Sequence, residues 1–259
     1  MQPKISLFAS AVRPHLWESF FKSLEGTSIP VEVVFAGNTP PNIPFVDWYD
    51  VKFKYITTDN IKPAQCYEIA RRECTGELVS WTADDCEYPN NILGKAYEYY
   101  EKMGLSVCDI LSLQSKENYG NMILTDMSVH SFFGGRPETP RMSPLGIVDN
   151  NFLDRLGGID RRFVCGQYEN DIVMRLYEAG GTLFPFGDKD LYVEIDHVKK
   201  HGALQNHRPF AEGYKKDREV LESRWVKDGI VSPTHLDNGT EKFEDADILT
   251  KSQSNCKNY

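Results

Sequence analysis

The sequence has few cysteines and no long apolar run. Its six cysteines include no Cys-x-x-Cys pair, and their spacing fits neither a zinc module nor a dense disulfide framework. We therefore expect free thiols in a reducing compartment. No stretch approaches the ~20 apolar residues of a membrane helix, and the apolar run at residues 5–9 is too short for a signal sequence. These absences predict a soluble cytoplasmic protein without a membrane span.

An excess of positive charge is also missing, because the formal net charge is −9. A protein that neutralises the phosphates of a nucleic acid shows the opposite balance, so neither nucleic acid nor an anionic membrane is expected as a partner. Internal repeats are absent. Hydrophobic residues make up 41% of the 259 residues, which is enough for a full core and excludes wholesale disorder. The length suits one large α/β domain with a short appendage, or two small domains.

The first eighty residues alternate between strand and helix patterns. Strands are predicted at 5–9, 31–36, 53–56 and 78–81, and helices at 14–24 and after Lys62-Pro63. This order is typical of a doubly wound sheet, in which ligands bind beyond the carboxyl ends of the strands. The segments 10–13, 36–38 and 83–85 follow three such ends.

The remaining two thirds of the chain are less regular. We expect strands at 109–113, 122–129 and 191–195, a loop at 131–146, and helices at 168–179 and 209–226. The tail from about residue 233 is polar and acidic with few apolar residues, which predicts a mobile segment.

Two adjacent acids, Asp84 and Asp85, follow the strand predicted at 78–81. Carboxylates on a tight turn can present oxygen ligands to a hard divalent cation, and that cation can bridge a diphosphate. Acids followed by a proline, here Pro89, are also common in ordinary turns and helix starts.

A second acidic pair opens the helix predicted at 168–179, after a glycine-broken loop. Glu169 could accept a proton from a hydroxyl group, as general base catalysis requires. Asp171 could do the same, but acids at a helix N-terminus also favour the helix dipole, and Asp171 can pair with Arg175 one turn on.

A third segment, 196–202, follows the strand predicted at 191–195. Its His197 is a usual kind of ligand for Mn²⁺, and Lys199 and Lys200 could hold phosphate oxygens. A solvated loop is the alternative interpretation.

Taken in order, these segments resemble the family-2-type glycosyltransferases of the glycosyltransferase-A fold. Gly76-Glu77-Leu78-Val79, running into Asp84-Asp85 and then Pro89, matches the family's first acidic motif, and Gly157 through Leu176 matches its second. The likeness covers about residues 4–200. It implies a Rossmann-like, mostly parallel sheet flanked by helices in one domain at 1–205. The halves at about 1–103 and 104–205 would take the nucleotide-sugar and the acceptor, and 206–259 would form a C-terminal extension.

The resemblance implies a metal-dependent, inverting transfer of a sugar from a nucleoside-diphosphate sugar to a hydroxyl of a glycan or other glycoconjugate. UDP is the expected nucleotide, with GDP as an alternative, and Mn²⁺ or Mg²⁺ the expected metal. By position, Asp85 matches the metal-binding acid, Asp84 an acid near the donor ribose or the metal, and His197 a further metal or diphosphate ligand. Glu169 matches the catalytic base, and Asp171 a competing base or acceptor contact. The residues expected to bind the donor are Ala9, Ser10, Ala11, Arg13, Asn38, Gln65, Asp84, Lys199 and Lys200, with Arg208 beside the departing diphosphate.

Two departures from the family pattern keep other functions open. Gly37-Asn38 stands where the family usually has an acid that contacts the base, although Asn38 could still bond a uracil edge. Cys86 stands where many members have a third Asp, so a catalytically degenerate module that binds a nucleotide-sugar or a glycan is one rival. A sugar-1-phosphate nucleotidyltransferase is less compatible, because it needs a glycine-rich loop after the first strand and residues 10–14 contain no glycine. Acceptor recognition is expected at 115–146 and in the C-terminal extension, through side chains such as Tyr119, Phe132, Phe133 and Arg136.

Overall fold

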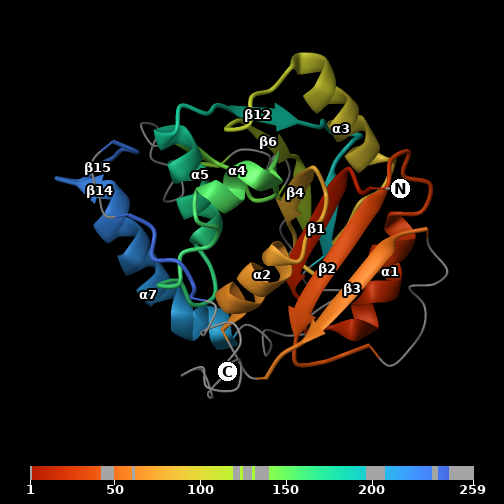
Figure 1. Ribbon diagram of the computed structural model, residues 1–259, viewed down its shortest axis with the longest axis horizontal. Coiled ribbons are helices and arrows are strands. Elements are labelled where there is room, and N and C mark those ends of the chain that lie inside the picture. Colours follow the sequence, from red (N-terminus) through yellow and green to blue (C-terminus); the bar gives the residue numbers. More distant parts are fainter. Residues whose placement is uncertain are drawn as a thin grey trace.

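A computed structural model describes residues 2–41, 50–59, 62–118, 123–124, 130–131, 140–196, 208–234 and 239–244. At its centre lies a seven-stranded sheet (Figure 1). In sheet order the strands are β12 (Leu183–Phe186), β6 (Ile110–Leu113), β11 (Gly146–Asp149), β4 (Leu78–Trp81), β1 (Ile5–Ser10), β2 (Val31–Gly37) and β3 (Lys52–Thr57). Within this described sheet β11 alone runs antiparallel to its neighbours. The predicted α/β class with a mostly parallel sheet is confirmed.

Helices cover both faces of the sheet. One face carries α1 (Trp17–Ser23), which follows the 3₁₀ turn η1 (Pro14–Leu16), and α3 (Ile92–Met103). The other face carries α2 (Pro63–Arg72), α4 (Asn150–Arg155), α5 (Tyr168–Glu178) and α7 (Arg208–Trp225). In Figure 1, α7 lies beside α5, on the side of the molecule away from β3.

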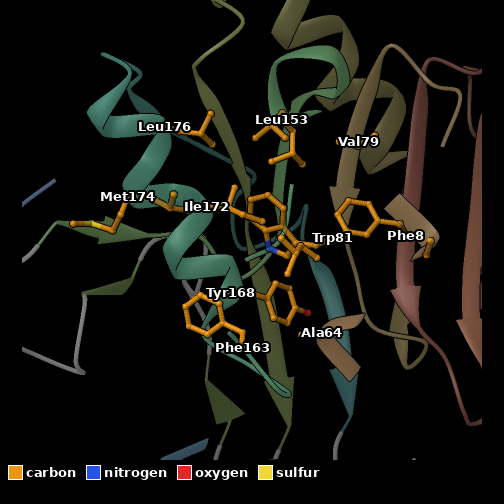
Figure 2. Packing of buried hydrophobic residues seen from close by; sticks show 14 of the residues in the cluster. Phe8, Ala64, Val79, Trp81, Leu153, Phe163, Tyr168, Ile172, Met174 and Leu176 are labelled. Atoms are coloured by element: carbon orange, nitrogen blue, oxygen red, sulfur yellow. The ribbon is translucent and has the colours of Figure 1, made fainter. Parts of the chain in front are cut away.

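The strand sequences explain why both faces are covered. β2 is apolar except for Glu32 and is buried along its whole length, as expected of a strand between two helical layers. In β1, Phe8 faces the α2 side while Leu7 and Ala9 face the α1 side, following the two-residue period of a strand. Figure 2 shows Phe8 on this α2 side, in the same cluster as Ile172 of α5.

Smaller sheets lie around this centre. One has the order β5 (Cys86–Glu87), β13 (Val193–Asp196), β7 (Ser115–Asn118) and β8 (Ile123–Leu124). Two more are pairs: β9 (His130–Ser131) with β10 (Arg141–Met142), and β14 (Val226–Lys227) with β15 (Ile230–Val231).

Residues after 205 take part in the core of the domain. Leu221 and Trp225 of α7, together with Val231 and Phe243, are buried in the same apolar cluster as α2 and α5. The backbone at 239–244 packs on the loop after α4, where the Arg161 N–H donates to the Glu241 carbonyl at 2.8 Å. Of the tail predicted to be mobile, residues 235–238 and 245–259 lie outside the described residues.

Five of the six cysteines are described, and all five are free thiols, as predicted. None of the described helices is both long enough and apolar enough to cross a membrane.

Candidate active site

The carboxyl ends of β1, β2 and β4 meet at one edge of the sheet. Ser10 pairs in register with Ala36, and Phe8 with Trp81, so the segments after these strands emerge side by side. The β1 segment is tied to the β2 segment because the Ala11 N–H donates to the Ala36 carbonyl at 2.9 Å. This edge holds five of the residues predicted to bind the donor, namely Ala9, Ser10, Ala11, Arg13 and Asn38.

Gly37 permits the close approach of these two segments. A Cβ at this position would lie 2.1 Å from the Ala11 carbonyl oxygen and 3.0 Å from the Tyr55 hydroxyl. That hydroxyl accepts from the Thr39 N–H at 3.0 Å and lies 3.4 Å from the Ala11 carbonyl. The glycine that replaces the expected family acid therefore has a steric role in the turn.

Arg13 is paired with both members of the first acidic motif. Its Nε donates to Asp84 Oδ1 at 2.7 Å, its Nη2 also contacts Asp84, and its Nη1 lies 3.1 Å from Asp85 Oδ2. Burial opposes the charge of the guanidinium, but the two carboxylates outweigh burial and raise the pKa of Arg13. The three charges together leave one net negative charge at this edge.

Asp84 receives further donors that occupy its carboxylate. The backbone N–H groups of Val12 and Arg13 donate to Oδ2 at 2.9 and 2.8 Å, and the Trp17 indole N–H donates to the same oxygen at 3.2 Å. Asp84 is fully buried. Its carboxylate thus fixes the loop after β1 to the turn after β4.

Both acids of the first motif are buried and engaged by protein groups, Asp84 by several donors and Asp85 by Arg13. Carboxylate oxygens suit Mn²⁺ and Mg²⁺, but the oxygens of Asp84 are already engaged by protein donors. Within the described part of the chain, no group of three or more His, Cys, Asp and Glu side chains could hold a metal ion. Cys86, which stands in place of a third acid, packs in the apolar cluster under α1.

Tyr67 of α2 connects the two acidic motifs and was not predicted from the sequence. Its hydroxyl donates to the Thr82 carbonyl at 2.6 Å, directly before the acids, and its ring lies 4.9 Å from that of Tyr168 in α5. Burial raises its pKa, so it stays a neutral donor. Gln65, predicted at the donor site, is buried two residues earlier in the first turn of α2. No spacing in the sequence indicates such a link across three elements.

Glu169 lies in the first turn of α5. The residue is partly exposed, but its Oε2 is sealed from solvent and has no hydrogen-bond partner among the described residues. Burial raises the pKa of Glu169 to about 7, against the opposing effect of the N–H groups of Glu169 itself and of Gln167. A carboxylate with a pKa near neutrality and an unoccupied oxygen can accept a proton at physiological pH.

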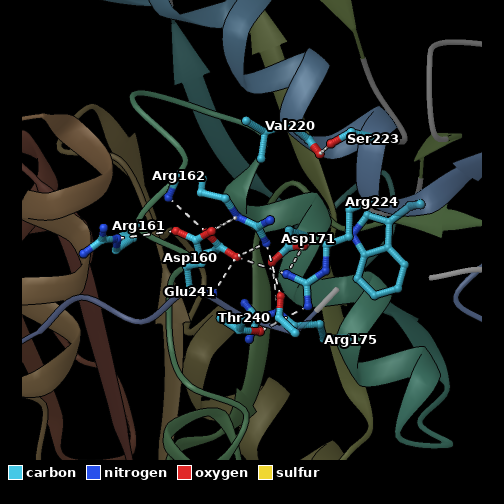
Figure 3. A network of polar contacts seen from close by, with 12 residues as sticks. Asp160, Arg161, Arg162, Asp171, Arg175, Val220, Ser223, Arg224, Thr240 and Glu241 are labelled. Atoms are coloured by element: carbon cyan, nitrogen blue, oxygen red, sulfur yellow. Dashed lines mark hydrogen bonds and ion pairs between the residues drawn. The ribbon is translucent and has the colours of Figure 1, made fainter. Parts of the chain in front are cut away.

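Asp171 is buried in a network of cations (Figure 3). Its carboxylate accepts from Arg175 Nε at 2.9 Å and from the Trp225 indole N–H at 2.8 Å, and it lies 3.2 Å from Arg224 Nη1. The predicted pairing with Arg175 is therefore present. The same Arg224 group bonds Asp160 at 3.1 Å, so the network joins α5, α7 and the loop between α4 and α5.

Several predicted site residues lie outside the described residues, namely His197, Lys199, Lys200, Tyr119, Phe132, Phe133 and Arg136. Arg208 begins α7, and only its backbone is described.

The fold is the glycosyltransferase-A fold, as the sheet order and the similarity to solved structures show. One similar structure is S. aureus TarS 1-349 in complex with UDP, with a TM-score of 0.60 and 16% identity over 86% of this chain and 67% of that chain. The same protein in complex with UDP-GlcNAc has a TM-score of 0.59 and 15% identity, over 86% of this chain and 68% of that chain. GalNAc-T7 with UDP, GalNAc and Mn²⁺ has a TM-score of 0.61 and 14% identity, over 87% of this chain and 49% of that chain. The sequence itself matches no family model and no curated protein.

Proposed function

We propose that this chain is an inverting, family-2-type glycosyltransferase that moves a sugar from a UDP-sugar to a hydroxyl of a glycan or other glycoconjugate. The observation that carries the proposal is Glu169, whose carboxylate has a pKa of about 7 and one buried oxygen without a partner among the described residues. The Tyr67–Tyr168 contact links its helix to the turn that holds Asp84 and Asp85. The likeness to structures that contain UDP and UDP-GlcNAc supports the choice of donor.

In the proposed reaction Glu169 takes the proton of the acceptor hydroxyl as its oxygen attacks the anomeric carbon. The new carbon–oxygen bond forms as the bond to the diphosphate breaks, so one displacement inverts the configuration. The nucleoside diphosphate leaves with the bonding electron pair and becomes more negative. Lys199, Lys200 and Arg208 are proposed to stabilise that charge, and Asn38 to bond the uracil edge.

Asp85, with His197, is proposed to hold Mn²⁺ or Mg²⁺. Such an ion would neutralise charge on the donor diphosphate. Arg13 pairs with Asp85 at 3.1 Å, so this guanidinium has to release the acid or share it with the ion. Asp84 acts as the anchor of Arg13 and of residues 11–13, which border the donor.

The binding of a nucleotide-sugar without turnover is a second candidate. It is favoured by the pairing of Arg13 with both acids, because this cation already supplies part of the charge that a metal would bring. A nucleotidyltransferase is disfavoured further, because the N–H groups of Val12 and Arg13 donate to Asp84 and are not available to cradle a triphosphate.

The test is a thermal-shift and turnover experiment. UDP and GDP are each added with Mn²⁺, with Mg²⁺ and with EDTA, and UDP release from UDP-GlcNAc and other UDP-sugars is followed. A ligand at a hundred times its Kd adds about 2.7 kcal/mol, which corresponds to a rise in Tm of roughly 5–10 °C.

We expect a rise for UDP that is lost in EDTA and in Asp85→Ala, and turnover that is lost in Glu169→Gln. Glu98→Gln, an exposed acid on α3, is the matched control. A UDP shift without turnover would instead support the binding module.

A further inference from the structure

We propose that Asp217 of α7 is a positioning residue for Glu169. The inference rests on the proposed function, and it assigns a role in the active site to a helix that follows the predicted catalytic domain.

The geometry is three consecutive backbone N–H groups that converge on one carboxylate. The Val164 N–H donates to Asp217 Oδ1, and the Cys165 and Gly166 N–H groups donate to Oδ2, each at 2.8 Å. Asp217 is fully buried. Without this carboxylate, three adjacent donors of a largely buried loop would lose their acceptor.

Gly213 brings α7 close enough for these bonds. It precedes Asp217 by four residues, so both lie on one face of the helix. A Cβ at Gly213 would lie 2.6 Å from Cys165 Sγ and 3.1 Å from Val164 Cγ1. The contact between α7 and this loop is therefore fitted to a helix without a side chain at that position.

The loop divides its N–H groups between two acids. Residues 164–166 donate to Asp217, and the next groups, those of Gln167 and Glu169, donate to the Glu169 carboxylate. Gln167, the first donor of the second set, has a φ of +64°, a left-handed conformation that is strained for a non-glycine residue. Asp217 fixes the backbone directly before this strained residue. It thereby sets the orientation of the Glu169 side chain at the start of α5.

Asp217 also acts on Glu169 through its charge. Cys165 and Tyr168 on its own segment and Asp217 on α7 are titratable groups that interact electrostatically with Glu169. Burial raises the pKa values of Cys165 and Tyr168, so both are neutral at pH 7. The carboxylate of Asp217 adds to the effect of burial and raises the pKa of Glu169 further.

The experiment compares Asp217→Asn with Glu219→Gln, an exposed acid two residues along α7 that gives the same change in charge. The first readout is the carboxyl carbon resonance of Glu169, assigned with Glu169→Gln and titrated in the free protein. We expect its pKa to fall in Asp217→Asn, and to stay at the wild-type value in Glu219→Gln.

The second readout is turnover of the UDP-sugar that the wild type uses. In Asp217→Asn we expect kcat to fall on the order of tenfold or more with little change in KM for the donor. Asp217→Glu keeps the charge but not the reach, so it should keep the raised pKa and recover only part of kcat. If Asp217→Asn does not fold, Asp217→Glu is the variant in which the titration and kcat are compared with the wild type.

Wild-type titration and wild-type kcat in Asp217→Asn would overturn the inference. A shifted titration in a protein that turns over no UDP-sugar would overturn the transferase assignment, while the coupling of Asp217 to Glu169 would stand.

Discussion

The indole N–H of Trp225 donates to Oδ1 of Asp171 at 2.8 Å, so the last residue of α7 is bonded to the first turn of α5. Both residues are fully buried. The bond joins α7 to α5, whose first turn carries Glu169 two residues before Asp171. Rigidity of the candidate base therefore depends on residues that follow it by more than fifty positions.

We expect Trp225→Phe to destabilise the protein. The ring is largely kept, but Asp171 loses a buried donor, which costs about 1–3 kcal/mol and lowers the Tm by roughly 2–10 °C for a chain of this size. Urea unfolding measures the change. Trp225→Phe in an Asp171→Ala background should cost less, and equal costs in the two backgrounds would show that the bond contributes nothing.

The stability of the protein should depend on pH through Glu169. Its pKa is about 7 in the native state and 4.5 without the fold, so between these values the native state binds more protons than the unfolded state. Stability from this group is thus highest below about pH 4.5 and falls until about pH 7.

Glu169→Gln removes the decrease in stability that Glu169 causes between about pH 4.5 and pH 7. Relative to the wild type it should be more stable at pH 8 than at pH 5, by up to about 3 kcal/mol. Unfolding in urea at the two pH values measures the difference, with Glu98→Gln as the control. The same effect of Glu169→Gln at both pH values would contradict the assigned pKa.

The pH dependence of the transfer rate should reflect the ionisation of Glu169. A general base must be deprotonated, so kcat/KM should rise with pH through an apparent pKa of about 7 and level off above it. Initial rates between about pH 5.5 and 9 define this limb. A profile that is flat over this whole range would contradict a base with a pKa of about 7.

Arg13→Ala should destabilise the protein more than Asp85→Ala does. Removal of the guanidinium takes the paired cation from the fully buried Asp84, which keeps only its N–H donors, at a cost of about 1–3 kcal/mol. Removal of Asp85 leaves Arg13 paired with Asp84. Thermal unfolding of both variants makes the comparison, with Val12→Ala, half-exposed in the same loop, as the control. A smaller loss for Arg13→Ala would mean that water or another cation replaces it.

Local patterns account for the parts of the fold that were predicted. The strands at 5–10, 31–37 and 78–81 are short apolar runs bounded by polar residues, and α5 and α7 have clear helical periodicity. Each was found within one residue of its expected bounds. The pairing of Asp171 with Arg175 was predictable for the same reason, since both lie on one helix face.

Features set by distant partners could not be predicted. The helix α3 was missed, and it begins after Asn90 and Asn91, which both have positive φ and give no ordinary capping signal. The pairing of Arg13 with Asp84 spans 71 residues and that of Asp217 with residues 164–166 spans 51–53. Such contacts form only when segments distant in the sequence pack together in the fold. The periodicity of hydrophobic residues within one segment does not indicate them.

The three bonds of Asp217 have a consequence for the order in which the site is completed. During synthesis the loop at 164–166 leaves the ribosome about fifty residues before its carboxylate partner. Until α7 docks, its N–H groups have only water to bond. A nascent or partly unfolded chain can therefore contain both acidic motifs and the whole sheet while its candidate base is not yet fixed. Catalytic competence would arrive last, together with the closing of the C-terminal helix.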